Sequence, residues 1–161
     1  MTKEILTVGM SLLLALVFAT TTVPEAVAPG AVPTEEQTEQ VPEKRYYLAA
    51  NERELICEVV MAESGTEPYT GKIAVSQCIL NACEQTGKRP AEIVTEYGYT
   101  ARRVKPSAEV EKAVSAVFDD GETVTDAKIL FFYAPALVSS AWHESQTYVC
   151  TIGGHRFFEE G

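Results

Sequence analysis

Glu63 lies in the stretch of this sequence best suited to chemistry, residues 61–68 (MAESGTEP). An apolar helix is expected to end at this glutamate, where the helix dipole disfavours an anion. Partial burial there would raise the pKa of its carboxyl group, which suits a general acid near neutral pH. A solvated glutamate at a fraying helix end is the alternative interpretation. Glu67 is expected to be a turn residue or to hold the loop.

Two other polar residues, His155 and Asn81, occupy sequence positions at which they could support such a site. His155 follows the pair Gly153-Gly154 and precedes two phenylalanines. It is expected either at a cleft edge near Glu63 or at a strand end with an ordinary hydrogen bond. Asn81 is polar inside an apolar helix and needs a hydrogen-bond partner if it is buried. It is expected either to fix the Glu63 loop or to cap a turn at the helix end.

The first two expected helices flank Glu63. Asn51 and Glu54 form a capping-box pattern at the start of the first helix. Apolar residues then recur at helical spacing until the Ser-Gly-Thr-Glu-Pro segment at 64–68 breaks the pattern. The second helix is expected over about 70–83, with its apolar face made by Ile73, Ala74, Ile79 and Leu80.

Two further helices and an antiparallel hairpin complete the expected fold. Pro90 fits the first turn of the third helix, Ser107 caps the fourth, and Gly121 ends it. The pattern then changes to that of strands, at 129–133 and 148–152. Gly153-Gly154 turns the chain into a second hairpin arm. Four helices followed by a hairpin predict an α+β fold.

The first 45 residues are not expected to belong to the folded domain. Residues 5–19 form an apolar run that is shorter than the about 20 residues of a membrane span, and residues 26–28 (AVA) fit a signal-peptidase site. We therefore expect a signal peptide at 1–28, with an uncleaved membrane anchor as the alternative. A disordered Pro/Glu-rich linker at 29–45 and one folded domain at 46–161 follow. The protein is expected to be exported.

Charge and cysteine content exclude several classes of function. The 13 Lys and Arg against 23 Asp and Glu give a net charge of −10, which argues against nucleic acid and anionic membranes as partners. Four cysteines in an exported domain permit disulfides, with Cys57–Cys78 and Cys83–Cys150 as the pairings considered and buried free thiols as the alternative. No C-x-x-C or H-E-x-x-H motif occurs, so neither a metal site nor a cofactor is expected.

Four sequence fragments, in order, carry a resemblance to a known family. Residues 62–68 (AESGTEP) are similar to its motif A-E-(A/S)-x-G-E-P, and 71–81 (GKIAVSQCILN) to G-(Q/K)-x-A-V-A-x-V-(I/V)-L-N-R. Residues 130–135 with Trp142, and then 152–158, resemble its F-Y-(N)-P strand, its tryptophan and its I-G-x-H-x-F-Y end. Over about residues 52–158 the chain thus resembles the SleB/CwlJ-type cell-wall hydrolases, whose founding members act on spore-cortex peptidoglycan.

The chain departs from this family at several positions. Ala82 stands where the family has Arg, and Phe158 where it has Tyr. The first glycine of the opening motif is displaced. The segment 97–105 lacks the family's Q-F-S stretch, and Tyr99 is the residue that stands in for it. These departures affect the expected contacts with substrate more than they affect the expected acid, Glu63.

The resemblance implies a small lysozyme-like or transglycosylase-like domain that cleaves peptidoglycan glycan strands with Glu63 as its essential acid. A lytic transglycosylase needs one carboxyl group, because the muramyl 6-hydroxyl closes a 1,6-anhydro ring. An inverting hydrolase needs a second carboxylate about 6.5–9.5 Å away, for which Glu67 and Glu144 are the local candidates. We therefore expect a lytic transglycosylase. A muramidase-type hydrolase and an inactive peptidoglycan-binding module are the alternatives.

The resemblance also implies a setting and a set of supporting residues. The expected protein is a monomer, secreted or tethered to the membrane, that acts on the cell wall in spore germination, vegetative remodelling or phage-like lysis. The basic cluster at 102–105 lies either in a solvated loop or against stem-peptide carboxylates, and each candidate aromatic either stacks on sugar or belongs to the core. The expected substrate-binding or supporting residues are Glu67, Asn81, Tyr99, Tyr133, Trp142, His155 and Phe158.

Overall fold

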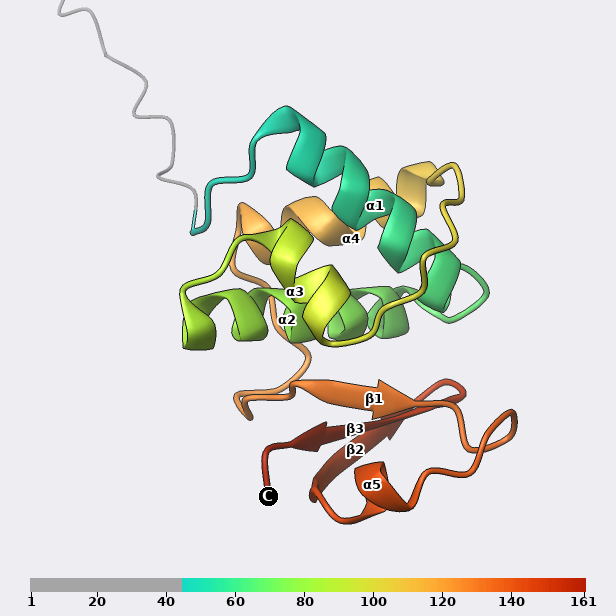
Figure 1. Cartoon of the computed structure of the whole chain (residues 1–161). Coiled ribbons are helices and arrows are strands. Elements are labelled where there is room, and N and C mark those ends of the chain that lie inside the picture. Colours follow the sequence, from blue (N-terminus) through green and yellow to red (C-terminus); the bar gives the residue numbers. More distant parts are fainter. Residues whose placement is uncertain (1–44) are drawn as a thin grey trace, which may run out of the picture. The chain divides into compact units, whose positions relative to one another are not determined.

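Helices and strands form two layers in the computed structural model, which describes residues 45–161 (Figure 1). The expected signal peptide, and the expected linker up to residue 44, lie outside the described residues. The α+β fold is confirmed, and the three expected strands are present, with a fifth short helix that the sequence did not predict. The elements are α1 (Ala50–Ser64), α2 (Tyr69–Thr86), α3 (Pro90–Glu96), α4 (Ala108–Phe118), β1 (Phe131–Tyr133), α5 (Ala141–Glu144), β2 (Thr147–Ile152) and β3 (His155–Glu159).

Helix α1 begins two residues before the expected position. The cap assigned to Asn51 and Glu54 is wrong, since both side chains are exposed and the N-cap is Ala49. The carboxylate of Glu52 accepts a hydrogen bond of 2.9 Å from the amide of Ala49. It also receives the guanidinium of Arg89, whose hydrogen bond lowers the pKa of Glu52. This contact from the start of α3 explains why Glu52 takes the capping position.

Helix α2 is the central element, and every residue from 71 to 83 is buried. The predicted apolar face is confirmed, since Ile73, Ala74, Ile79 and Leu80 are all buried. Polar residues on the other side of the helix are buried as well. Gln77 donates a 2.8 Å hydrogen bond to the carbonyl of Thr125 and accepts one of 2.9 Å from the amide of Val124. Asn81 donates a 2.9 Å bond to the carbonyl of Ile129. The two amides thus hold the backbone that leads into β1.

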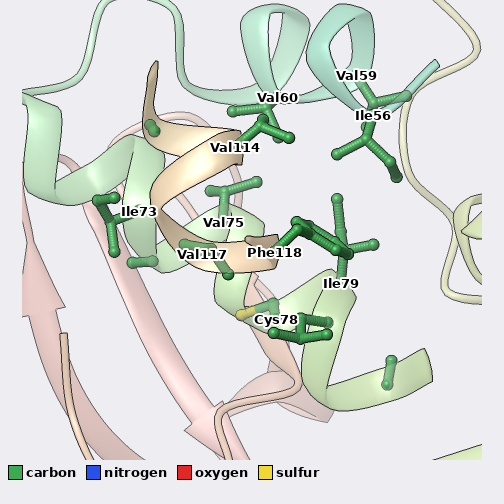
Figure 2. Close-up of a cluster of buried hydrophobic side chains, with 14 of the residues drawn as sticks. Ile56, Val59, Val60, Ile73, Val75, Cys78, Ile79, Val114, Val117 and Phe118 are labelled. Atoms are coloured by element: carbon green, nitrogen blue, oxygen red, sulfur yellow. The ribbon is translucent and has the colours of Figure 1, made fainter. Parts of the chain in front are cut away.

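The hydrophobic core lies where α1, α2 and α4 meet (Figure 2). Phe118 at the end of α4 is fully buried there. Val114 lies one helical turn before Phe118, and Val117 directly precedes it. The side chains of α1 and α2 that face them include Ile56, Val59, Val60, Ile73, Val75, Cys78 and Ile79. The expected fourth helix is confirmed, because the hydroxyl of Ser107 accepts the amide of Val110 at its start.

The sheet has the strand order β1-β3-β2, and both pairings are antiparallel. The predicted hairpin is the β2–β3 pair, with Gly153 in its turn at a φ of 58°. Adjacent residues of β3 point to opposite faces of the sheet. Phe157 joins the main core, whereas Phe158 packs against the aromatic rings of Tyr133 and His143. Helix α5 therefore covers a second aromatic layer on the far face.

All four cysteines are free thiols, so the two disulfides considered are wrong. Cys57, Cys78 and Cys83 are buried, and Cys150 is half-buried. Burial raises the pKa of Cys57 to about 11 and is also the main cause that raises the pKa of Cys83 to about 11. These thiols therefore serve as small apolar core residues at neutral pH.

Candidate active site

A cavity of about 420 Å³ lies where the end of α1 meets the sheet. Glu63 enters it from the C-terminal end of α1, as the sequence predicted for a helix that breaks at this point. Aromatic rings make most of the remaining wall, and Tyr97 stacks on Phe131 with ring centroids 5.8 Å apart. The lining residues are Glu63, Glu96, Tyr97, Gly98, Tyr99, Leu130, Phe131, Phe132, Trp142 and His143.

The carboxyl group of Glu63 is half-buried and has one firm contact. Its Oε1 accepts a hydrogen bond of 2.7 Å from the amide of Thr100. This bond fixes the side chain against the segment that follows α3. Because Oε1 is occupied by a donor, Oε2 is the atom that would carry a proton in the acid form.

A second hollow of about 330 Å³ also borders Glu63. It is lined by Met61, Ala62, Glu63, Gly65, Thr66, Arg102 and Val104. Glu63 is the residue common to both hollows. A chain-like ligand that occupies both would therefore pass over this carboxyl group.

Glu67 and His155 lie together at the hairpin turn and line neither hollow. Oε2 of Glu67 accepts a 2.8 Å hydrogen bond from the amide of Gly154. Nδ1 of His155 is buried 3.5 Å from Oε1 of Glu67, without a hydrogen bond between them. The amino group of Lys72, itself buried, donates to the carbonyl of Glu67. Glu67 thus joins the α1–α2 loop to the hairpin, and His155 is not at the edge of the Glu63 cavity.

The aromatic candidates separate into two groups. Tyr99 and Trp142 line the cavity, and Trp142 is 54% exposed, with its ring 4.9 Å from that of Phe131. Tyr133 and Phe158 stack on each other at 5.9 Å on the face under α5, outside the cavity lining. The first pair can meet a ligand in the cavity. In the second pair Phe158 is completely buried, whereas Tyr133 is half-buried.

The ring and the hydroxyl group of Tyr99 have different surroundings. The ring packs at 5.8 Å from Phe132 in the cavity wall, but the hydroxyl oxygen is buried and has no hydrogen-bond partner among the described residues. Burial raises the pKa of this phenol well above its ordinary value, and the charges of Cys78 and Glu63 add to the shift. Tyr99 therefore contributes its apolar ring to the cavity wall, while its neutral hydroxyl group is buried.

Asn81 is not in contact with the Glu63 loop, nor does it cap the end of α2. Its hydrogen bond to the carbonyl of Ile129 places it at the start of β1. Both expected roles of Asn81 are therefore wrong. It supports the cavity indirectly, because the segment that it holds continues into Leu130 and into Phe132 of β1, which line the wall.

Sequence reasoning missed Glu96 and His143, which also line the cavity. Both carboxylate oxygens of Glu96 are bound by the amino group of Lys88, at 2.5 and 2.8 Å. Burial lowers the pKa of His143 below its ordinary value, so its imidazole is neutral near pH 7. Glu96 ends a short helix and His143 lies in the four-residue α5. Because these helices are so short, no sequence pattern marked either residue.

Neither a metal cluster nor a membrane span is found in the part of the chain that the structure describes. Over residues 45–161, no three His, Cys, Asp or Glu side chains gather closely enough to bind a metal ion. None of the helices in the same range has the length and hydrophobicity to cross a membrane.

Comparison with known proteins gives one family and two solved structures. The family model described as Cell Wall Hydrolase matches residues 66–158. The matched region begins just after Glu63. The catalytic domain of the Bacillus cereus SleB protein is 24% identical, with a TM-score of 0.58 over 70% of this chain and 93% of that chain.

The second structure is the catalytic domain of the germination-specific lytic transglycosylase SleB from Bacillus anthracis. It is also 24% identical, with a TM-score of 0.56 over 70% of this chain and 97% of that one. At this identity the two matches establish a shared fold. No curated protein sequence matches the chain.

Proposed function

Because the chain belongs to the cell wall hydrolase family, we propose that it cleaves the glycan strands of peptidoglycan as a lytic transglycosylase with Glu63 as its catalytic acid and base. The observation that carries this proposal is the position of Glu63, the carboxyl group common to the two hollows. The bond to be broken would then lie over Oε2. Aromatic rings on one side suit the apolar faces of sugars.

The proposed reaction uses the same carboxyl group twice. Glu63 first donates its proton to the glycosidic oxygen as the bond from that oxygen to C1 of the muramyl residue breaks. The 6-hydroxyl of that muramyl residue then attacks C1, and the carboxylate of Glu63 takes the hydroxyl proton. The products are a free 4-hydroxyl on one fragment and a 1,6-anhydro-muramyl end on the other, and Glu63 is protonated again.

Two of the other three candidate carboxylates, Glu67 and Glu144, support a mechanism with one carboxyl group. Glu67 binds the hairpin turn, and Glu144 binds both the hydroxyl of Tyr133 and, at 2.9 Å, the guanidinium of Arg156. Neither lines a hollow. Glu96 does line the cavity and is held by Lys88. This residue favours a muramidase-type hydrolase as the second candidate, in which Glu96 would activate water.

The setting that we propose follows from the substrate. Peptidoglycan lies outside the cytoplasmic membrane, so the enzyme must be exported, and the apolar segment within 1–28 would serve as its signal peptide or anchor. We expect a monomer, because one chain supplies both hollows. The surplus of acidic residues argues against attraction to anionic wall polymers as the means of finding the substrate.

The masses of the soluble products test the proposal. The full chain without residues 1–28 is incubated with purified peptidoglycan from spore cortex and from vegetative wall, and the products are analysed by mass spectrometry. Fragments ending in 1,6-anhydro-muramic acid, lighter by one water than hydrolysis products, are the expected result. Reducing ends of normal mass would identify a hydrolase. Binding to the wall without release of any sugar would leave a binding module.

Replacement of Glu67 by Gln is expected to change the rate of cleavage by less than about threefold, because Gln can still accept the hydrogen bond from Gly154. A catalytic second carboxylate would instead lose about 10²-fold or more. Initial rates of soluble product release measure the difference. Glu67→Ala is the matched control, and it is expected to lower the free energy of unfolding by about 1 kcal/mol.

A further inference from the structure

The guanidinium of Arg102 has no hydrogen-bond or ion-pair partner among residues 45–161, a property that it shares with Lys105. Residues 45–161 contain 17 Asp and Glu against 11 Lys and Arg, so carboxylates are in excess. Arg53, Lys88 and Arg156, for example, each pair with one at 2.9 Å or less. Within the described range, no hydrogen bond or ion pair engages the guanidinium of Arg102.

The position of Arg102 is also distinctive. Arg102 is the cation that lines the hollow beside Glu63. The neighbouring Arg103 has its own contacts, a 2.9 Å hydrogen bond to the carbonyl of Thr100 and an ion pair of 3.8 Å with Glu58. Lys105 is exposed and lines neither hollow. Of the three basic residues in this cluster, only Arg102 adjoins the proposed reaction centre.

The backbone that carries Arg102 is held in place relative to Glu63. The amide of Thr100 donates to Glu63, and the hydroxyl of Thr100 accepts a 3.1 Å hydrogen bond from the amide of Arg102. The guanidinium of Arg103 adds a 3.2 Å bond to the carbonyl of Arg102. A position fixed in this way reduces the entropic cost of binding a ligand.

We propose that Arg102 binds a carboxylate carried by the lactyl arm of the muramyl residue, and so selects the register in which the glycan strand crosses Glu63. The inference rests on the function proposed above. Both sugars of the strand are neutral, and its anionic groups are the carboxylates of the stem peptide or, where the peptide is absent, of the lactyl group itself. A guanidinium matches a carboxylate with two parallel hydrogen bonds. The muramyl residue would then lie toward the second hollow, and the aromatic cavity would hold the other side of the bond.

The test compares substrates with and without this charge. Three sets of soluble glycan strands are used: strands with stem peptides, strands from which an amidase has removed the peptides, and the latter with their lactyl carboxylates chemically amidated. KM and kcat are measured on each for the wild type, Arg102→Ala and Lys105→Ala. The Lys105 variant removes the same charge three residues away.

We expect Arg102→Ala to raise KM about three- to tenfold at low salt with little change in kcat, because the exposed guanidinium acts in binding and is screened by ions. Lys105→Ala should leave KM within about twofold on the same basis. If KM rises only on strands with stem peptides, Arg102 binds a peptide carboxylate. If KM also rises on strands without peptides, Arg102 binds the lactyl carboxylate.

Several outcomes would overturn the inference. They are an unchanged KM for Arg102→Ala, an equal rise on the amidated strands, or a loss in kcat alone. None of these affects the proposed function, which fails only if the wild type releases no sugar from any of the substrates.

Discussion

Replacing Glu63 by Gln is expected to reduce the release of soluble glycan fragments by about 10²- to 10⁴-fold. The amide cannot give a proton to the glycosidic oxygen, and it cannot accept one from the 6-hydroxyl. The fold should be unchanged, because the Gln oxygen can still accept the 2.7 Å hydrogen bond from the amide of Thr100. Rates of product release and circular dichroism of the full chain measure the two effects.

Glu96→Gln is the matched control for this variant, since both carboxylates line the same cavity. It is expected to retain most of the activity, because its oxygens are occupied by Lys88. Loss of the catalytic acid should lower the cleavage rate by about 10²-fold or more. A Glu63→Gln variant that keeps more than about a tenth of the wild-type rate would therefore contradict this role for Glu63. Equal losses at Glu63 and Glu96 would instead indicate a hydrolase with two carboxyl groups.

Phe157→Ala is expected to lower the free energy of unfolding by about 3–5 kcal/mol, a large part of the stability of a small domain. The side chain is completely buried in the main core, and it packs at 5.7 Å from Phe132. Its loss leaves a cavity between the sheet and the helices. Thermal unfolding of the full chain should show a melting temperature lower by more than about 10 °C.

Tyr148→Ala is the control, because this aromatic residue of β2 is 48% exposed on the far face of the sheet. Its removal should cost about 1 kcal/mol or less. If the two variants unfold at similar temperatures, the sheet is not anchored to the helices through Phe157.

Local signals in the sequence predicted the elements well. Ser107, Pro90 and the Gly153-Gly154 pair mark caps and a turn whose physics lies within a few residues, and all three are found where expected. The N-cap of α1 was misplaced because Arg89, distant in sequence, holds Glu52. The pairing of β1 with β3, like the four-residue α5, depends on contacts across the fold that no local pattern contains.

The candidate site was predicted in part for a similar reason. Tyr99 and Trp142 line the cavity with Glu63, as the resemblance implied. His155 and Phe158 do not. His155 lies at the hairpin turn beside Glu67, and Phe158 packs against Tyr133 and His143. No local sequence pattern contains these contacts. Periodicity predicted the apolar face of α2 but could not identify the partner of Asn81, whose hydrogen bond goes to the carbonyl of Ile129 just before β1.

The burial of α2 on all sides has a consequence for the order of folding. Helices α1, α3 and α4 are close to α2 along the chain, so closing these contacts costs little loop entropy. We expect the sheet to join later, when the backbone before β1 meets the amides of Gln77 and Asn81. Since the cavity needs walls from both layers, we expect it to form last. A lytic enzyme built in this way has no functional cleft until its folding is complete.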